Sequence, residues 1–540
     1  MISEQDPRFF WTHGMEMELQ IIDKTGKVIG GEEAMRDIEP IIKEAKNILI
    51  EILESTYPPP AIQKKIQSMP ALDRNKEKGL VVVLGYSVPG QDPVMIDIIG
   101  RDGNVTIATY ILELVTPPSE TVEELTWWAK ILQHIMEQAL PSRYQILSTG
   151  LNPLVDNYTR GLSFADQHHI GIQNQEERMA AYNSIRNFVP HLIGLSTNSP
   201  FINGLSTDSV RIARNRVLAP GCVKSLRLQK NETMLSAGLP SQYIPYMRQY
   251  DPDYYVKITQ KASLEDAKYQ DIFPFTQFGT IETRIMDAQL TLARRIGFAL
   301  VVQALAKKGV KYYHKGKTVP NAGSEDLFHN RKSAIERGLL APHRKSREAI
   351  WANEKIDGDF VKYYYGTFDR QLRYMFQSVQ NMFLYIEPEL REMGAWDTPY
   401  INTLMASVFW GLDDKLLAPV TGAEYQLYLY ETFHHDIQKT IKKLREIYLQ
   451  SIEDPTYDPI SSKITVIDPI IYDQLEADPV IPIKEKTKKT AAVAAEKKSF
   501  IGVIKKEDLV KERKLNWWII GAVFAVIIII GVVLGIILGL

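Results

Sequence analysis

The stretch FGTIETRIMDAQL, residues 278–290, combines a strand pattern with two opposite charges. Ile281, Thr283 and Ile285 alternate with Glu282, Arg284 and Met286. In a β-strand this period of two would place the last three on one face. Buried charges are costly unless they are paired or bind a ligand. A carboxylate beside a guanidinium in so apolar a segment therefore raises the question of what satisfies the two charges.

Three other segments show the same mixture of an apolar strand pattern with isolated polar side chains. HGMEMELQIID, residues 13–23, alternates apolar with polar positions, and TYILELVTPP carries one carboxylate among aliphatic residues. DQHHIGI places an amide and an imidazole on one face. The polar positions on these segments are Glu16, Glu18, Gln20, Glu113, Gln167 and His169.

If these strands share a sheet, their carboxylates, one imidazole and Arg284 would line a single surface. Oxygen ligands with few histidines and no cysteine favour Mg²⁺ or Mn²⁺ over Zn²⁺. Magnesium commonly binds through carboxylates and substrate phosphates, and Arg284 would then neutralise a transferring phosphoryl group. The alternative is that Glu16 and Glu18 face solvent on a half-exposed sheet. Spacing alone leaves both interpretations open.

The composition is that of a large globular protein. The chain has 540 residues, a formal net charge of −2 and 45% hydrophobic residues, which suffice for a large core and more than one domain. The near-neutral charge gives no reason to expect nucleic-acid binding. The single cysteine, Cys222, rules out an intrachain disulfide and fits a reducing compartment.

Strands scattered among helices and bounded by turn residues predict an α+β fold with mainly antiparallel pairing. Strands are expected at residues 15–23, 79–87, 94–99, 105–116, 144–149, 167–172 and 279–287. Helices are expected at residues 32–55, 174–196, 288–308, 325–340 and 358–385.

The last stretch of the sequence is strongly apolar. Residues 517–540, WWIIGAVFAVIIIIGVVLGIILGL, carry no charge and are long enough to cross a bilayer. We expect a single-pass C-terminal transmembrane helix over 516–540, with the preceding basic residues and the soluble domain on the cytoplasmic side. Gly531, Gly535 and Gly539 recur every four residues, which suits a homodimer seam, although glycine is common in membrane helices anyway.

The remaining chain divides into three expected parts. Residues 1–385 form a main domain with an insertion at about 57–104, and residues 386–452 form a helical extension. Residues 453–515, rich in Pro, Asp and Lys, are expected to be a flexible tether that anchors this domain to the membrane helix. A short folded hairpin around 464–472 is the alternative for part of that tether.

The motifs together, in order from about residue 13 to 340, resemble the carboxylate–amine ligase family, also called the second glutamate–cysteine ligase family. GMEMELQIID resembles its G-x-E-x-E strand, ILELVTPP its E-L-x-T segment and QHHIGI its H-V-H-V-G strand. STNSP is similar to its S-x-x-S-P loop, and FGTIETRIMDAQLTL resembles F-G-T-V-E-V-R-V-x-D-x-x-L-T-L. FHNRKSAIERGLLAP resembles its N-R-x-x-A-x-x-x-G-L helix.

This resemblance implies a glutamine synthetase-like fold, in which a curved antiparallel sheet forms a funnel flanked by helices. It also implies an ATP- and Mg²⁺-dependent (or Mn²⁺-dependent) ligase. ATP would phosphorylate a carboxylate, typically the γ-carboxylate of glutamate, and an amine such as cysteine would displace the phosphate to form an amide.

The resemblance also implies residue roles. The metal ligands would be Glu16, Glu18, Glu113 and Glu282, with Gln167 and His169 at the family's histidine positions. Glu282 and Arg284 would be catalytic, with Arg284 on the phosphates. The nucleotide would be approached by Asn330, Arg331 and Arg337, and the carboxylate substrate by Arg214 and by the loop containing Asn152.

Three positions depart from the family pattern. Thr109 stands where a second glutamate is usual, and Asn152 and Gln167 each replace a histidine. Losing a carboxylate removes a full charge from a magnesium site, whereas the amides keep hydrogen bonding and lose titration. The alternative function is therefore a weakly active or inactive ligase-like protein that serves as a membrane-tethered binding or scaffold protein.

Overall fold

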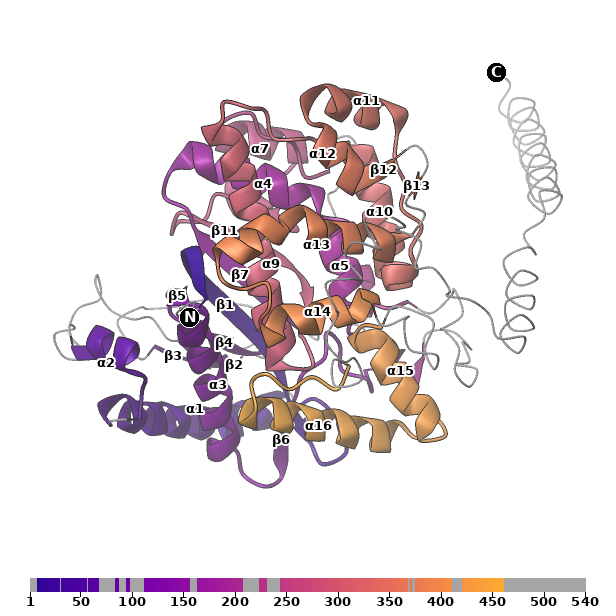
Figure 1. The fold of residues 1–540 in the computed structure, drawn as a ribbon. Coiled ribbons are helices and arrows are strands. Elements are labelled where there is room, and N and C mark those ends of the chain that lie inside the picture. The colour runs from indigo at the N-terminus through magenta and orange to yellow at the C-terminus, as the bar shows by residue number, and fades with distance from the viewer. Residues whose placement is uncertain are drawn as a thin grey trace, which may run out of the picture. The chain divides into compact units, whose positions relative to one another are not determined.

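A nine-stranded β-sheet forms the centre of the computed structural model (Figure 1). Its strands are β1 (Arg8–Asp23), β2 (Val83–Tyr86), β3 (Val94–Asp97), β4 (Leu112–Val115), β5 (Ser119–Thr121), β6 (Tyr144–Leu147), β7 (Ala165–Gly171), β10 (Ile272–Phe273) and β11 (Thr280–Asp287). The order is β10-β11-β7-β1-β4-β2-β3, with β5 and β6 also paired to β1. These pairs are antiparallel, as predicted.

The structure describes only part of the chain. The described residues are 7–29, 31–55, 57–67, 83–86, 94–97, 111–155, 163–206, 223–230, 243–367, 370–371, 374–409 and 420–460. Two short hairpins lie outside the main sheet: β8 (Phe201–Ile202) with β9 (Leu205–Ser206), and β12 (Gly366–Thr367) with β13 (Arg370–Gln371).

Strand β1 separates the core from the polar face of the sheet. Its side chains Met15, Met17, Leu19 and Ile21 are completely buried, which confirms the predicted alternation. In the sheet order β7 and β4 flank β1 on its two sides, and β5 and β6 also pair with it. The polar side chains of β1 therefore lie in the interior of the sheet and not on an outer strand.

Helices complete the fold. They are α1 (Gly31–Glu54), α2 (Pro60–Gln67), α3 (Val122–Ala139), α4 (Gln175–Asn187), α5 (Val189–Ser196), α6 (Leu226–Lys230), α7 (Pro252–Thr259), α8 (Leu264–Ala267), α9 (Leu292–His314), α10 (Ser324–Arg337), α11 (Arg347–Ile356), α12 (Gly358–Phe360), α13 (Met375–Glu392), α14 (Pro399–Phe409), α15 (Gly422–Thr432) and α16 (Ile437–Glu453). Helices α3 and α9 contact β1, and α1 packs against α3.

Helix α9 is buried along most of its length because its glycines admit neighbouring helices closely. A side chain at Gly309 would meet the backbone oxygen of Ala180 in α4 at 2.3 Å. One at Gly297 would meet the backbone oxygen of Tyr400 in α14 at 2.6 Å. Any larger residue at either position would force the helices apart.

The insertion at 57–104 contributes to the sheet where it is described. β2 and β3 lie where strands were expected and pair with each other antiparallel, and β2 also pairs with β4. The continuous helix expected over 358–385 is wrong. A π-helix at Val361–Tyr365 and the β12–β13 hairpin interrupt it, since Gly366 adopts a φ of 85° and ends the helical backbone.

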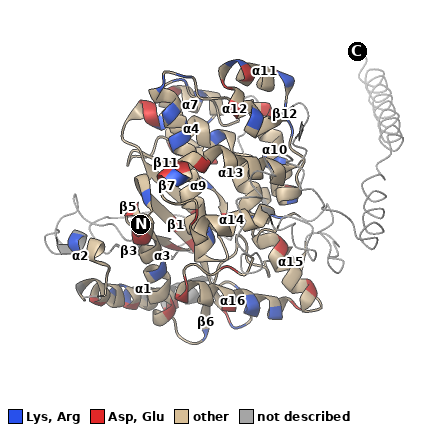
Figure 2. Ribbon diagram, in the orientation of Figure 1, with Lys and Arg blue, Asp and Glu red and all other residues tan. Residues whose placement is uncertain are grey.

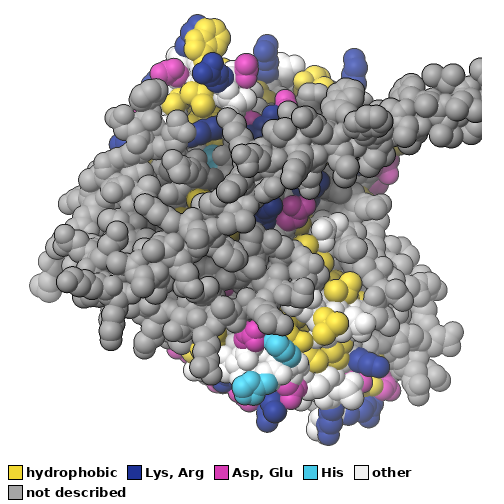
Figure 3. All heavy atoms as spheres, turned by 90° about the vertical axis from the view of Figure 1, so that its right-hand side faces the viewer, with side chains coloured by type: hydrophobic (Ala, Val, Ile, Leu, Met, Phe, Trp, Pro, Cys, Tyr) yellow, Lys and Arg dark blue, Asp and Glu magenta, His cyan; other side chains and the backbone are white. Residues whose placement is uncertain are grey.

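The C-terminal helices belong to the same compact unit as the sheet. Helix α13 continues through residue 385, where we expected a boundary, so the extension is not set apart there. Helix α15 docks through Gln426, whose Nε2 donates to Asn198 Oδ1 at 2.6 Å. On the surface at this end of the molecule, acidic, basic and histidine side chains are mixed, as Figure 3 shows.

The expected tether does not begin at 453. Asp458 is buried, accepts a hydrogen bond from Thr291 Oγ1 at 2.7 Å and lies 3.6 Å from Arg294 Nη1. A buried carboxylate held by two partners fixes this segment to α9 and the residue before it. The rest of the tether and the segment 516–540 lie outside the described residues. Of the described helices, none is long and apolar enough to span a bilayer.

Candidate active site

The polar face of the sheet gathers the charged side chains that the sequence singled out. In the register, Glu16 lies opposite Gln167, Glu18 opposite Glu113, and Glu282 opposite His169. Four strands, β4, β1, β7 and β11, thus bring their polar positions together. Acidic and basic positions adjoin near β7 and β11 in Figure 2.

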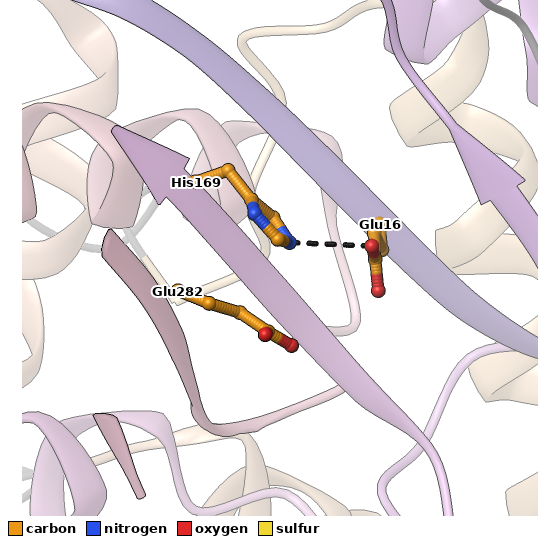
Figure 4. Close-up of side chains that lie close together, drawn as sticks. All are labelled: Glu16, His169 and Glu282. Carbon is orange, nitrogen blue, oxygen red and sulfur yellow. Dashed lines mark ion pairs between the residues drawn. The ribbon is translucent and has the colours of Figure 1, made fainter. Parts of the chain in front are cut away.

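Glu16, His169 and Glu282 form the tightest group (Figure 4). Their ligand atoms all lie within 4.8 Å of one another. His169 Nε2 is 3.2 Å from Glu16 Oε1, and its Nδ1 is 3.1 Å from the Thr280 hydroxyl. The contact at Nδ1 orients the ring so that Nε2 points toward Glu16, as the outer partner of a metal-binding histidine does. Two carboxylates and one imidazole suit Mg²⁺ or Mn²⁺.

A β-bulge interrupts β11 beside this group. Thr283 pairs with His168 but Met286 pairs with Asp166, so β11 has one more residue than β7 in this interval. The strict alternation that we extended to Met286 is therefore wrong beyond Arg284. The extra residue turns Met286 into the core, where it is fully buried, and brings Asp287 opposite Ala165 on the polar side.

Glu282 and Arg284 share one face, as predicted, and form an ion pair. Their side chains are 8% and 15% exposed, and the Arg284 guanidinium lies 5.7 Å from the centre of the Tyr269 ring. Arg284 Nε is buried and makes no hydrogen bond to any described residue. The arginine thus keeps a donor that an anionic ligand can use.

Glu18 and Glu113 add negative charge beside the group. Glu18 accepts hydrogen bonds from the Ala165 backbone NH at 2.6 Å and from Gln167 Nε2 at 2.7 Å. Burial raises the pKa of Glu18 to about 7, against the opposing effect of Arg284. Burial, with repulsion from Glu16 and Glu18, raises the pKa of Glu113 well above its usual value.

This excess of buried carboxylates fits a divalent cation, which would stabilise the ionised forms. The departure from the family pattern at Gln167 is compatible with that fit. Gln167 gives its amide NH to Glu18, while its Oε1 is buried without a hydrogen bond from the described residues. An amide oxygen is a suitable ligand for magnesium or manganese.

Asn152 is held in a closed hydrogen-bond network. Its Nδ2 donates to Gln20 Oε1 and to the Gly26 backbone oxygen, each at 3.0 Å, and its Oδ1 accepts from the Leu154 NH at 2.9 Å. Gln20 in turn donates to Thr149. These contacts give Asn152 a role in fixing the loop after β6 to the polar end of β1.

The residues expected at the nucleotide lie on α10. Asn330 exchanges two hydrogen bonds with the backbone of Arg344, at 2.7 and 2.8 Å. Arg331 is 1% exposed and donates hydrogen bonds to both oxygens of Asp271. Its guanidinium is therefore occupied by a buried carboxylate and is not open to a phosphate. Arg337 is exposed in the last turn of α10. Arg214, like Thr109, lies outside the described residues.

Two charged residues at the site were missed by sequence reasoning. Asp287 accepts four hydrogen bonds at 2.7–2.9 Å, from the Asn198 NH, the hydroxyls of Ser199 and Ser225, and Arg227 Nε. Asp287 could have been found from the bulge, had the bulge been recognised. Arg227 carries no local signal, because it lies in a short helix remote in sequence.

The fold and site define an α+β protein that presents carboxylates, an imidazole and an arginine on one face of an antiparallel sheet. Residues 124–354 match the model of glutamate-cysteine ligase family 2 (GCS2). This stretch of the chain is therefore similar to that family. The matched region includes His169 and Glu282, whereas Glu16 lies before it and joins the site through the pairing of β1 with β7.

Curated relatives match over a similar region. A provisionally named glutamate–cysteine ligase 2 of Ralstonia pickettii is 30% identical over 169 residues, which is 31% of this chain and 39% of that protein. Its Legionella pneumophila counterpart, ligase 2-1, is 31% identical over 188 residues, which is 33% of this chain and 43% of that protein. The matches thus span less than half of each relative.

Among solved structures, the glutamate–cysteine ligase of Francisella tularensis in complex with AMP is similar over 86% of this chain and 96% of its own. The sequence identity is 12% and the TM-score is 0.46.

Proposed function

We propose that this protein is an ATP- and Mg²⁺-dependent carboxylate–amine ligase. It would activate a carboxylate, such as the γ-carboxylate of glutamate, as an acyl phosphate and join it to an amine such as cysteine. The observation that carries this proposal is the convergence of Glu16, His169 and Glu282 within 4.8 Å, beside Arg284. The GCS2 match and the names of the relatives support the reaction class.

In this proposal Glu16, His169 and Glu282 hold a divalent cation, with Glu18, Glu113 and Gln167 beside them. When bound, the metal supplies neutralisation of phosphate charge. Arg284 orients the phosphates and opposes the negative charge on the transferring group. The sheet excludes water from behind these side chains because its opposite face is packed with apolar residues.

The test is release of ADP by the full-length purified protein, with ATP, Mg²⁺, glutamate and a panel of amines. We expect release that requires both the acid and an amine. Glu282→Gln should reduce it at least about a hundredfold, since it removes one ligand charge while keeping the shape. Glu120→Gln is the matched control, because Glu120 is an exposed carboxylate on β5 of the same sheet, and it should leave release unchanged.

If no acid and amine stimulate release while Mn²⁺ still binds the site, the alternative of an inactive ligase-like binding or scaffold protein is correct. Arg331 is buried against Asp271, and this pairing counts against a contact between Arg331 and the nucleotide. It does not count against metal binding, because Glu16, His169 and Glu282 come together without Arg331.

We further propose that residues 516–540 anchor the protein in a membrane with the ligase-like domain in the cytoplasm. The support is the uncharged sequence and its basic flank. The protein should stay with membranes on alkaline carbonate extraction, and a protease added on the cytoplasmic side should release the domain. Recovery in the carbonate supernatant would contradict the anchor.

The glycines of that segment would form the seam of a homodimer. Gly535→Ile should abolish crosslinking between copies in the membrane, since a bulky side chain prevents close helix approach. Ala522→Ile adds bulk about 180° around the helix from Gly531, so it is the matched control and should leave crosslinking unchanged. Equal crosslinking of both variants would contradict the seam.

A further inference from the structure

The bulge in β11 is held by a buried arginine that the sequence did not indicate. Arg227 Nη2 donates to the backbone oxygens of Arg284, at 3.3 Å, and Ile285, at 2.8 Å. Both residues lie in the interval where β11 has its extra residue. A bulge disrupts the regular ladder locally, so its carbonyl groups need other donors.

From this geometry we infer that Arg227, held by Asp287, is a positioning residue for Glu282 and Arg284. The inference rests on the proposed function of that site and adds a residue to it. Arg227 does not touch the reacting groups itself. It fixes the backbone at Arg284 and Ile285, which lie two and three residues after Glu282.

Arginine suits this role better than lysine. Its planar fork donates from Nε to Asp287 Oδ1 at 2.8 Å while Nη2 reaches the two carbonyl groups. The side chains of Arg227 and Asp287 are each 1% exposed, so solvent does not replace these bonds. A lysine ammonium is a single point donor and cannot reproduce a fork that spans both sides.

Asp287 is itself fixed from several directions. In addition to Arg227, its oxygens bind the backbone of Asn198 and two serine hydroxyls. A side chain on Gly150 would lie 2.5 Å from Asp287 Cγ, so this loop packs against the carboxylate without space between them. Asn198 also binds Gln426 of α15, which ties the C-terminal helices to the same point.

A second buried pair holds the other side of the bulge. The backbone NH of Arg284 donates to the Asp271 backbone oxygen at 3.0 Å. Both carboxylate oxygens of Asp271 accept from Arg331, at 2.5 and 2.8 Å. The NH and carbonyl of Arg284 are thus each fixed to a segment that carries a buried Arg–Asp pair, and its side chain is left to face the site.

The test is Mn²⁺ binding to the full-length protein, measured by electron paramagnetic resonance, with the metal alone as the probe. We expect Arg227→Lys to weaken Mn²⁺ affinity about tenfold or more, the usual effect of losing a group that orients metal ligands. Asp287→Asn, which keeps the shape and one acceptor, should weaken it less and in the same direction. It also provides a test if Arg227→Lys does not fold.

Two controls separate positioning from general stability. Arg294→Lys changes an equally buried arginine, paired with Asp458 away from the bulge, and should lower stability without changing Mn²⁺ affinity. In a Glu282→Gln background, Arg227→Lys should have little further effect, because it acts through a ligand that has already been changed.

If the unaltered protein binds Mn²⁺ and Arg227→Lys binds it equally well, the inference is overturned and the proposed function stands. The inference is also overturned if the loss is as large in the Glu282→Gln background. Failure of the unaltered protein to bind Mn²⁺ would overturn the proposed metal site and, with it, the inference.

Discussion

Two arginine–carboxylate pairs lie on opposite faces of the same sheet, and they differ in how completely they are satisfied. On the core face, Arg295 Nε is 2.9 Å from both oxygens of Asp166, and its other nitrogens donate to Gln133 and Ser148. Asp166 also accepts from the Gln289 NH at 2.7 Å. Both side chains are completely buried.

On the polar face, Glu282 and Arg284 form the other pair. Arg284 Nε donates no hydrogen bond to the described residues, and Glu16, Glu18 and Glu113 lie nearby. The charges on the core face are balanced and fully bonded, whereas the polar face has more negative than positive charge. The comparison indicates that the first pair stabilises the fold and that the second is arranged for a ligand.

Breaking the core pair should have the largest effect. Arg295→Met leaves Asp166 buried without its cation, and we expect it to lower the free energy of unfolding by about 3–5 kcal/mol. Urea denaturation measures this loss. The remaining folded protein should bind Mn²⁺ as before, since Arg295 lies on the opposite face from the metal group. A loss below about 1 kcal/mol would contradict a structural role.

The pH dependence of stability should reveal the crowded carboxylates of the polar face. Because the pKa of Glu18 rises from 4.5 to about 7 on folding, the folded state keeps a proton that the unfolded state loses between these values. Stability of the metal-free protein should therefore fall as pH rises through this window, and the part of the fall that Glu18 contributes should be complete above it. Glu18→Gln should remove up to about 3 kcal/mol of the fall.

Urea denaturation in EDTA between pH 5 and pH 8 measures this effect. An equal slope in the Glu18→Gln variant would contradict it. Adding Mn²⁺ should stabilise the unaltered protein more at pH 8 than at pH 6, because the metal requires the ionised carboxylates.

The isosteric change Glu282→Gln should affect metal binding much more than stability, unlike the change at Arg295. The amide still accepts a hydrogen bond from Arg284, and Glu18 and Glu113 remain to balance the charge of that arginine. Since no buried charge is left uncompensated, the free energy of unfolding without metal should change by less than about 1 kcal/mol. Mn²⁺ affinity should fall about tenfold to a hundredfold, because a ligand charge is lost. Denaturation and paramagnetic titration of the same preparation measure both quantities, and an unchanged affinity would exclude Glu282 as a ligand.

The smallest effect is expected at Gln167. Gln167→His restores the residue usual in the family, and we expect Mn²⁺ affinity to change by less than about threefold. The reason is that both side chains offer one donor to Glu18 and one acceptor to a metal. A change above about tenfold would show that the departure at this position matters for metal binding.

Much of the fold could be predicted because the patterns that determine it are local. The alternation along residues 15–21 indicated which face of β1 is buried, and the strand and helix ranges followed from short apolar runs and turn residues. The members of the candidate metal site could also be anticipated, since Glu16, His169 and Glu282 each stood out as polar side chains within apolar strands. Their convergence required the register, which no single segment contains.

The sequence by itself therefore determined the α+β class, the core face of the sheet and the residue types available to a cation. Only the tertiary structure decided the bulge that turns Met286 inward, the placement of Arg227 beneath it and the burial of Arg331 against Asp271. The physical reason is the distance along the sequence between the residues that interact. A side chain's face depends on its immediate neighbours, whereas a bulge and a buried ion pair depend on partners from segments that are distant along the chain.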